Sequence, residues 1–172
     1  MPTDTTKQPG APVEPEAHVA EFYNVDKERP FRVSATYHER EQVIISFPNQ
    51  ALVSDHARGL GGDEMGPSPG ELLLGSLAAC TAVYIGRNAA RKKIPVQSIV
   101  VKTRLEPGHE KIDGPMHSLG FLARIEKQVE VVGDLTAEQV EMVRFFSNNC
   151  AIGETLRRGV QLDEQLTVIP PG

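Results

Sequence analysis

Short runs of alternating apolar and polar residues follow a polar leader in the first third of the chain. Residues 1–19 are rich in Pro, Thr and Glu and lack apolar periodicity, which predicts a disordered leader before a single domain at residues 20–172. Residues 31–37, 43–47 and 51–53 then have the composition of strands. Polar or Pro-Asn turns separate these segments, so we expect three consecutive antiparallel strands.

A long helix is predicted from Ser68. Ser68 can cap its N-terminus, Pro69 suits the first helical position, and Glu71 completes a capping box. The helix is expected to end near Lys93, because a proline follows two residues later. Residues 72–85 are apolar or small on every side, and such a helix is normally buried on every side. Its cover could come from the strands, from later helices or from a second copy of the chain.

The remaining sequence predicts a hairpin, two helices and a last strand, which together make an α+β fold. The expected elements are strands at residues 98–105 and 120–125 with an extension at 129–132, a helix from a second capping box at Thr136 through Phe146, a short helix at 153–158, and a strand at 160–169. The segment 107–115, which contains Pro and Gly, would join the two strands of the hairpin.

Charge and termini exclude several classes of function. The formal net charge is −5 and no basic stripe is present, which argues against a protein that binds the phosphate backbone of nucleic acids. The N-terminus lacks the cationic start and apolar run of a signal peptide, and no apolar stretch reaches the ~20 residues that span a bilayer. We therefore expect a cytoplasmic protein with no nucleic-acid or membrane partner.

The two cysteines, Cys80 and Cys150, are the candidate chemistry of the chain. In a reducing cytosol each either fills a small space in the core or takes part in redox reactions. Cys80 lies in the middle of the long helix, away from the N-terminal field that lowers many thiol pKa values, so a reactive Cys80 needs another partner for its thiolate. No Cys-x-x-Cys motif occurs and no histidine pairs with a cysteine at ligand spacing, so we expect no metal and no other cofactor.

Distinct motifs surround both cysteines. They are Gly-Gly-Asp at 61–63 followed by Gly-Pro-Ser-Pro-Gly-Glu-Leu-Leu-Leu-Gly-Ser-Leu-Ala-Ala-Cys-Thr at 66–81, and Cys-Ala-Ile-Gly-Glu-Thr-Leu at 150–156. Together they resemble the OsmC/Ohr family, named for osmotically inducible protein and organic hydroperoxide resistance protein, over roughly residues 31–169. The resemblance implies an intertwined homodimer in which antiparallel sheets wrap two long central helices, with the cysteines near the subunit interface.

The resemblance also implies a reaction. Cys80 would attack the peroxide oxygen and become a sulfenic acid, and Cys150 would condense with it to a disulfide. A dithiol would then reduce the disulfide, the role of lipoyl groups in the Ohr branch. An arginine near the first hairpin holds the thiolate in the peroxidase branches; Arg40 is the candidate here and Arg58 the alternative. Either could instead be a solvated surface charge, an interpretation that suits Arg58 better than Arg40.

The sequence departs from the family pattern at two positions. The peroxidase branches usually carry Glu ten residues before the first cysteine, where this chain has Gly70. Glu71 is nine residues before Cys80, which places it on the opposite side of a helix, so it is better interpreted as the capping partner of Ser68. Ala151 also replaces the proline that commonly follows the second cysteine. These departures favour the OsmC-like branch.

Two hypotheses of function follow. The first is a thiol-dependent peroxidase that takes part in the oxidative stress response and reduces organic hydroperoxides in preference to hydrogen peroxide. The alternative is a non-enzymatic protein of the same fold that binds an apolar ligand in the dimer-interface cleft, with Cys80 as packing. The presence of both cysteines favours the enzyme, and Gly70 in place of Glu favours the binding protein.

Overall fold

The computed structural model describes residues 33–111 and 118–170, so the predicted leader and the beginning of the first predicted strand lie outside the described residues. The first part of the fold is a three-stranded antiparallel sheet. Its strands are β1 (Ser34–Tyr37), β2 (Val43–Ser46) and β3 (Ala51–Ser54), and they lie in the order β1-β2-β3. The prediction of three consecutive antiparallel strands is therefore confirmed.

A loop organised by one buried carboxylate connects the sheet to the long helix. Asp55 is 1 % exposed and accepts backbone N–H bonds from His56 (2.7 Å), Asp63 (3.1 Å) and Met65 (3.0 Å). The N–H of Met65 contributes most to lowering the pKa of Asp55, and burial partly opposes it. The loop includes the 3₁₀ turn η1 (Arg58–Leu60), which Gly61 ends with a left-handed φ of 98°.

The long helix, α2 (Pro69–Arg91), begins as its capping box predicts and ends two residues before the expected position. Glu71 donates its backbone N–H to the Ser68 hydroxyl at 3.3 Å, and the Glu71 carboxylate accepts the Ser68 backbone N–H at 2.8 Å. The expectation that α2 is buried on every side is wrong for one chain. Burial is confined to one stripe of the helix, formed by Leu77, Thr81, Ile85 and Ala89.

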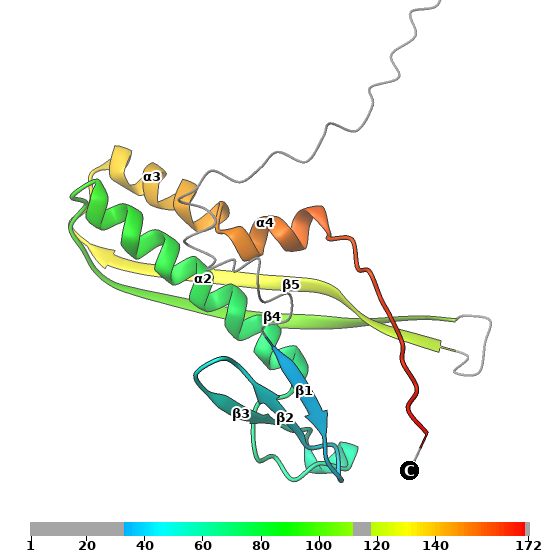
Figure 1. Cartoon of the computed structure of the whole chain (residues 1–172). Coiled ribbons are helices and arrows are strands. Elements are labelled where there is room, and N and C mark those ends of the chain that lie inside the picture. The colour runs from blue at the N-terminus through cyan, green and yellow to red at the C-terminus, as the bar shows by residue number, and fades with distance from the viewer. Residues whose placement is uncertain (1–32, 112–117, 171–172) are drawn as a thin grey trace, which may run out of the picture.

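Under α2 lies a long hairpin of two strands, β4 (Val96–Lys111) and β5 (Ser118–Gly133) (Figure 1). Each strand has 16 residues and spans about 50 Å. The predicted hairpin is confirmed, but β4 continues through Pro107, which the sequence placed in the connection. A register shift between Glu106 and Pro107 lets the strand pass a residue that has no N–H to donate.

The helices α3 (Ala137–Asn148) and α4 (Ala151–Arg158) follow the hairpin and pack beside α2 (Figure 1). A capping box between Thr136 and Gln139 starts α3 as predicted. The main core lies where α2, α3 and the beginning of β4 meet. Its buried members are Ile85, Ala89, Ile94, Val143 and Phe146. This core fixes the direction in which α3 delivers the chain to Cys150.

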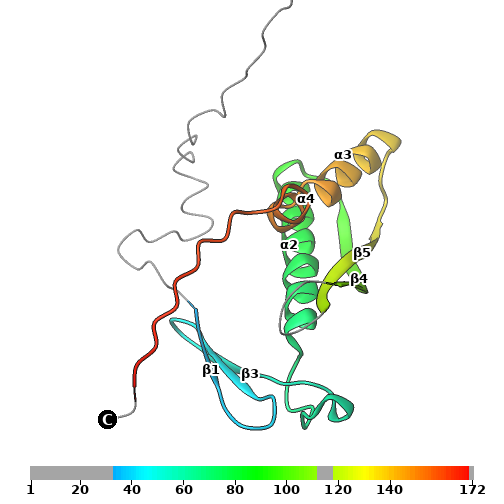
Figure 2. The ribbon, with the colours of Figure 1, turned by 90° about the vertical axis from the view of Figure 1, so that its right-hand side faces the viewer.

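The predicted last strand does not form. Residues 160–169 have no helical or strand structure, and their apolar side chains are exposed, from 63 % at Val160 to 88 % at Leu166. The segment crosses the β4–β5 hairpin in the view of Figure 1 but lies well away from it in Figure 2. The alternating sequence is therefore suitable for a strand, but the segment meets no sheet edge within residues 33–111 and 118–170 of one chain with which to pair.

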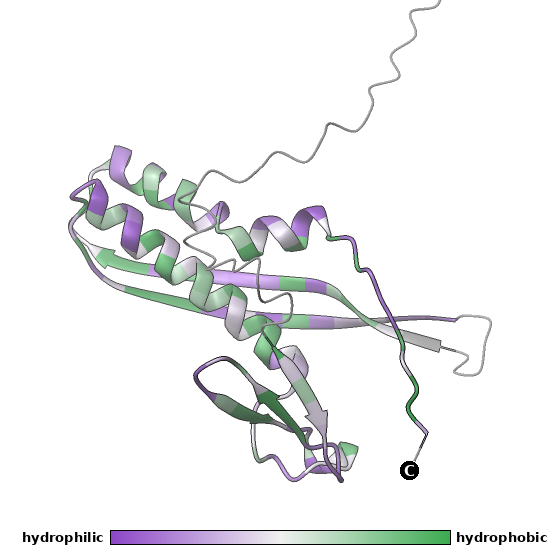
Figure 3. Cartoon of the chain, viewed as in Figure 1, coloured by the Kyte–Doolittle hydropathy of each residue, from purple (hydrophilic) through white to green (hydrophobic). Residues whose placement is uncertain are grey.

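Several apolar surfaces are left exposed in the part of the chain that the structure describes. Figure 3 shows apolar residues on β2 and β3, where Ile44 and Val53 are each 38 % exposed, and the three-stranded sheet stands apart from the helices in Figures 1 and 2. On α2, Val83 is 49 % exposed. The helix has 23 residues and is long and apolar enough to cross a membrane, a property that core helices of soluble proteins share.

Candidate active site

Cys80 lies halfway along α2, where this helix packs against α4. Its thiol faces the backbone N–H groups of Ala151 and Ile152, the first two residues of α4. Cys80 thus lacks the N-terminal field of its own helix, as its mid-helix position predicts, and the N-terminus of α4 supplies N–H groups in its place. The side chain is only partly buried, so reagents can reach it from solvent.

The environment nevertheless raises the pKa of the Cys80 thiol. Burial is the largest cause, because removal from water disfavours the thiolate. The N–H of Ile152 and, to a smaller extent, that of Ala151 lower the pKa, whereas the charge of Cys150 and a hydrogen bond to it raise the pKa. Most Cys80 is thus a neutral thiol at neutral pH, and the N–H groups of Ala151 and Ile152 stabilise the thiolate fraction that does form.

Cys150 is in contact with Cys80 but is enclosed by protein, with 0 % of its surface exposed. It is the N-cap of α4, where its Sγ accepts the Gly153 N–H at 3.4 Å. The Thr81 Oγ1 lies 3.2 Å from the same sulfur. Gly153 fits because a Cβ at this position would lie 3.1 Å from the Cys150 Sγ. The structure therefore brings both predicted cysteines together, one accessible and one enclosed.

Two cations that the sequence did not single out hold the turn before Cys150. Lys127 of β5 donates from Nζ to the Ser147 carbonyl at 2.5 Å, and Arg157 of α4 donates from Nη2 to the Asn148 carbonyl at 2.6 Å. These carbonyls belong to the C-terminal end of α3, where cations are favourable. Nothing in the local sequence distinguishes Lys127 from other strand lysines, so only the fold could identify it.

Lys127 also interacts electrostatically with the two cysteines. Burial is the main cause that lowers the pKa of Lys127, and the charge of Arg157 lowers it further. The charges of Cys150 and Cys80 act in the opposite direction and favour the ammonium form. By the same interaction, protonated Lys127 favours the thiolate form of Cys80.

Neither predicted arginine meets the cysteines within one chain. Arg40 lies in the β1–β2 turn, pairs with Asp63 at 2.7 Å and has a 64 % exposed side chain. Arg58 is 77 % exposed and pairs with Glu64 at 3.7 Å. Among the described residues, these carboxylates are the charged partners of the two arginines, and the sheet that carries Arg40 lies beyond the N-terminal end of α2, away from α4 (Figures 1 and 2).

Gly70, which stands where the peroxidase branches usually have Glu, lies in the first turn of α2. Glu71 is committed to Ser68, whose backbone N–H and hydroxyl lower the pKa of its carboxyl. The interpretation of Glu71 as a capping residue is therefore confirmed. A Cβ at Gly70 would meet only the Leu105 side chain, at 3.4 Å, so the backbone leaves room for a larger residue.

A cavity of about 330 Å³ lies near Cys150, and Gly153 is one of its lining residues, although neither cysteine lines it. Leu77 and Leu156 give it apolar walls, and Gly153, Lys127 and Arg157 also line it. Such a space suits a molecule with an apolar body better than a small polar one. Within residues 33–111 and 118–170, no three His, Cys, Asp or Glu side chains gather in a way that could hold a metal ion.

Comparisons with known proteins agree with this architecture. Residues 61–165, more than half of the chain, match the family model described as OsmC-like protein. No curated protein sequence matches the chain.

Solved structures show the same fold at low identity. An OsmC-like protein from Mycoplasma pneumoniae has a TM-score of 0.58 at 19 % identity, covering 73 % of this chain and 85 % of that one. An organic hydroperoxide resistance protein OsmC from Legionella pneumophila gives 0.52 at 18 %, covering 74 % and 90 %. One from Elizabethkingia anophelis, also an organic hydroperoxide resistance protein, gives 0.53 at 17 %, covering 74 % and 89 %. The chain therefore belongs to the OsmC-like protein family.

Proposed function

We propose that the protein is a thiol-dependent peroxidase that reduces organic hydroperoxides through Cys80 and Cys150. One observation supports this most: the partly exposed Cys80 thiol, which faces the N-terminus of α4, lies in contact with the fully enclosed Cys150 thiol. An accessible cysteine can attack a substrate, and an enclosed neighbour can capture the oxidised product before further oxidation. Two cysteines that only filled the core would not need this asymmetry.

The proposed reaction has three balanced steps. The Cys80 thiolate attacks the outer peroxide oxygen, the O–O bond breaks, and the alcohol leaves after taking a proton, so that Cys80 becomes a sulfenic acid. The Cys150 sulfur then attacks the Cys80 sulfur, the S–O bond breaks, and the Cys150 proton leaves with the hydroxyl as water. An external dithiol, for which a lipoyl group is a candidate, reduces the disulfide and is itself oxidised.

The working unit of this proposal is a homodimer in the cytoplasm. The exposed face of α2 carries Gly75, Ala79 and Val83, and a Cβ added at Gly75 would meet nothing within 4 Å. Small residues of this kind allow a second helix to approach closely. In such a dimer, Arg40 would serve the cysteines of the other subunit, because its own hairpin lies away from them.

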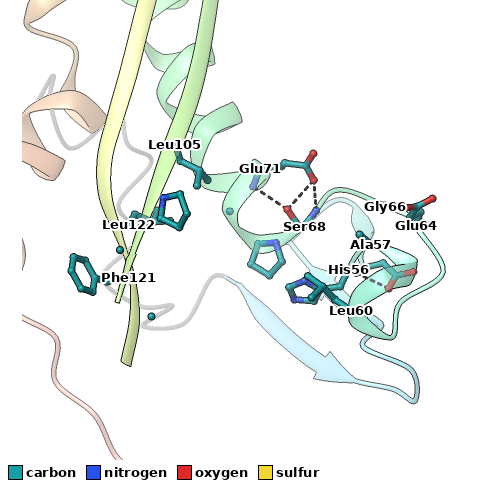
Figure 4. A pocket seen from close by; sticks show the side chains of 16 residues that line it. His56, Ala57, Leu60, Glu64, Gly66, Ser68, Glu71, Leu105, Phe121 and Leu122 are labelled. Carbon is teal, nitrogen blue, oxygen red and sulfur yellow. Dashed lines mark hydrogen bonds between the residues drawn. The ribbon is translucent and has the colours of Figure 1, made fainter. Parts of the chain in front are cut away.

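The alternative function, binding of an apolar ligand, is favoured by a separate cavity of about 1080 Å³. Figure 4 shows His56 and Leu60 of the loop on one side of this cavity, and Leu105, Phe121 and Leu122 of the hairpin on the other. These mostly apolar walls could hold an apolar molecule.

This second cavity is remote from the chemistry. It reaches along α2 as far as Glu71, nine residues before Cys80, which corresponds to about 14 Å along the helix axis. A ligand bound there would leave both thiols free, so the binding hypothesis gives no reason for the cysteine pair. We therefore prefer the peroxidase.

One experiment distinguishes the two functions. The dimer is given one equivalent of cumene hydroperoxide, free thiols are counted, and peptides are mapped. The peroxidase should lose two thiols per chain and yield Cys80 joined to Cys150, and Cys80→Ser should consume no peroxide. Hydrogen peroxide should react more slowly. Two thiols that stay free in the wild-type protein would refute the proposal and favour the binding protein.

A further inference from the structure

Thr81 follows Cys80 on α2, is fully buried, and contacts the other cysteine. Its Oγ1 donates to the Leu77 carbonyl at 2.8 Å, the usual bond of a mid-helix threonine to the residue four positions earlier. A hydroxyl has one proton, and a carbonyl can only accept. The Thr81 proton is therefore committed to Leu77.

The contact between Thr81 and Cys150 then has a defined direction. Because the Oγ1 proton faces Leu77, the 3.2 Å contact to Cys150 is one in which the thiol donates and the hydroxyl oxygen accepts. On its other side, the same sulfur accepts the Gly153 N–H at 3.4 Å. The Cys150 thiol is thus held between the Thr81 hydroxyl and the Gly153 N–H, with Cys80 as its third hydrogen-bonding neighbour.

We propose that Thr81 is a positioning residue for the resolving step: it holds the Cys150 side chain in the one rotamer that faces α2 beside Cys80. The inference rests on the proposed two-cysteine chemistry and adds a residue to it. Among the described residues, the enclosed Cys150 thiol has side-chain hydrogen bonds to Thr81 and to Cys80, and of these two partners only Thr81 keeps its place when Cys80 reacts. Loss of the acceptor would free the Cys150 thiol to rotate away from α2, which slows disulfide formation but not the attack of Cys80 on peroxide.

The test separates the two steps. Wild type, Thr81→Val and Thr81→Ser receive cumene hydroperoxide, and sulfenic acid is trapped with a dimedone probe while disulfide is followed by peptide mapping. Valine has nearly the shape of threonine but no acceptor, whereas serine keeps the hydroxyl. We expect Thr81→Val to form disulfide about tenfold more slowly, corresponding to ~1.4 kcal/mol, and to accumulate trapped or over-oxidised Cys80.

Two results distinguish positioning from a general structural role. Peroxide consumption in the first turnover should stay within about twofold of wild type, and Thr81→Ser should recover disulfide formation to within about threefold. A core defect would slow both steps equally, and the serine variant would not recover. If the valine variant does not fold, Thr81→Ala gives the same comparison without a second methyl group.

A peroxide-free arm keeps this inference separate from the proposed function. Diamide oxidises neighbouring thiols to a disulfide, so the same three proteins are treated with it. Suppose that the wild-type thiols resist cumene hydroperoxide but form a disulfide with diamide faster than those of Thr81→Val. The proposed peroxidase activity would then be refuted, and the role of Thr81 would be retained. Equal rates of disulfide formation in wild type and Thr81→Val, with either oxidant, would overturn the inference. If the wild-type protein forms no disulfide with either oxidant, both the proposed function and the role of Thr81 are overturned.

Discussion

The reactivity of Cys80 should depend steeply on pH, because its pKa is raised above that of an ordinary thiol. Only the thiolate is nucleophilic, and its fraction grows tenfold with each pH unit while the pH is below the pKa. An unperturbed thiol with a pKa of about 8.5 is ~3 % thiolate at pH 7, and Cys80 should have less. We therefore expect its alkylation rate to rise about tenfold per unit from about pH 6.5 to 8.5.

The same experiment can test the cation beside the cysteines. Lys127→Met keeps most of the apolar stem but removes the charge that favours the thiolate. Cys80 is the weakest of the charges that act on Lys127, so the alkylation rate at pH 7 should fall by less than about tenfold. Lys102→Met is the matched control, because Lys102 is 60 % exposed on β4 and pairs with Glu130.

The assay is timed alkylation of the wild-type protein with iodoacetamide, followed by acid quenching and peptide mapping. Label should collect on Cys80, since Cys150 is enclosed. A rate that is flat above about pH 7 would show that the thiolate is already formed, and would refute the inference that burial outweighs the donors of α4. Equal rates in the two lysine variants would refute the role of Lys127.

Three further predictions concern the dimer, the loop and the core. Mixed dimers of Arg40→Ala and Cys80→Ser chains should recover about half the peroxidase activity although both parent dimers are inactive, because Arg40 is proposed to act across the interface; inactive mixed dimers contradict this. Asp55 has a lowered pKa in the folded chain, so its stabilising effect is present above its unfolded pKa and disappears as pH falls through the folded value. Asp55→Asn should therefore lower the free energy of unfolding at neutral pH, and this free energy should decline less steeply in acid than in wild type. The exposed Asp134→Asn is the control in these acid titrations. Ile85→Ala should cost about 3–4 kcal/mol in urea unfolding, since Ile85 is 0 % exposed in the core, and Leu166→Ala, at 88 % exposed, should cost less than ~0.5 kcal/mol.

Features with a local cause could be predicted from the sequence. The two capping boxes place the beginnings of α2 and α3 because the hydroxyl of Ser68 or Thr136 and the side chain three residues later satisfy each other's backbone groups without help from the rest of the chain. The hairpin was also predictable, although its length was not. Its backbone pairing continues past Glu106 to Lys111, although the proline suggested an end.

Features with a distant cause could not be predicted in the same way. The N–H groups that face Cys80 belong to a helix about seventy residues later in the chain, and Lys127 reaches the site from a strand. The segment 160–169 shows the opposite case. Its alternation favours a strand, but strand formation depends on whether an edge is available, and the described part of one chain offers none.

The exposed face of α2 would make the measured stability of the protein depend on its concentration. When a second copy covers Gly75, Ala79 and Val83, part of the free energy of folding is supplied by association, and the unfolding equilibrium then includes protein concentration. Each tenfold dilution would cost the dimer about 1.4 kcal/mol. Melting temperatures from dilute fluorescence and concentrated calorimetry samples would therefore differ in a predictable direction, with the dilute sample unfolding first.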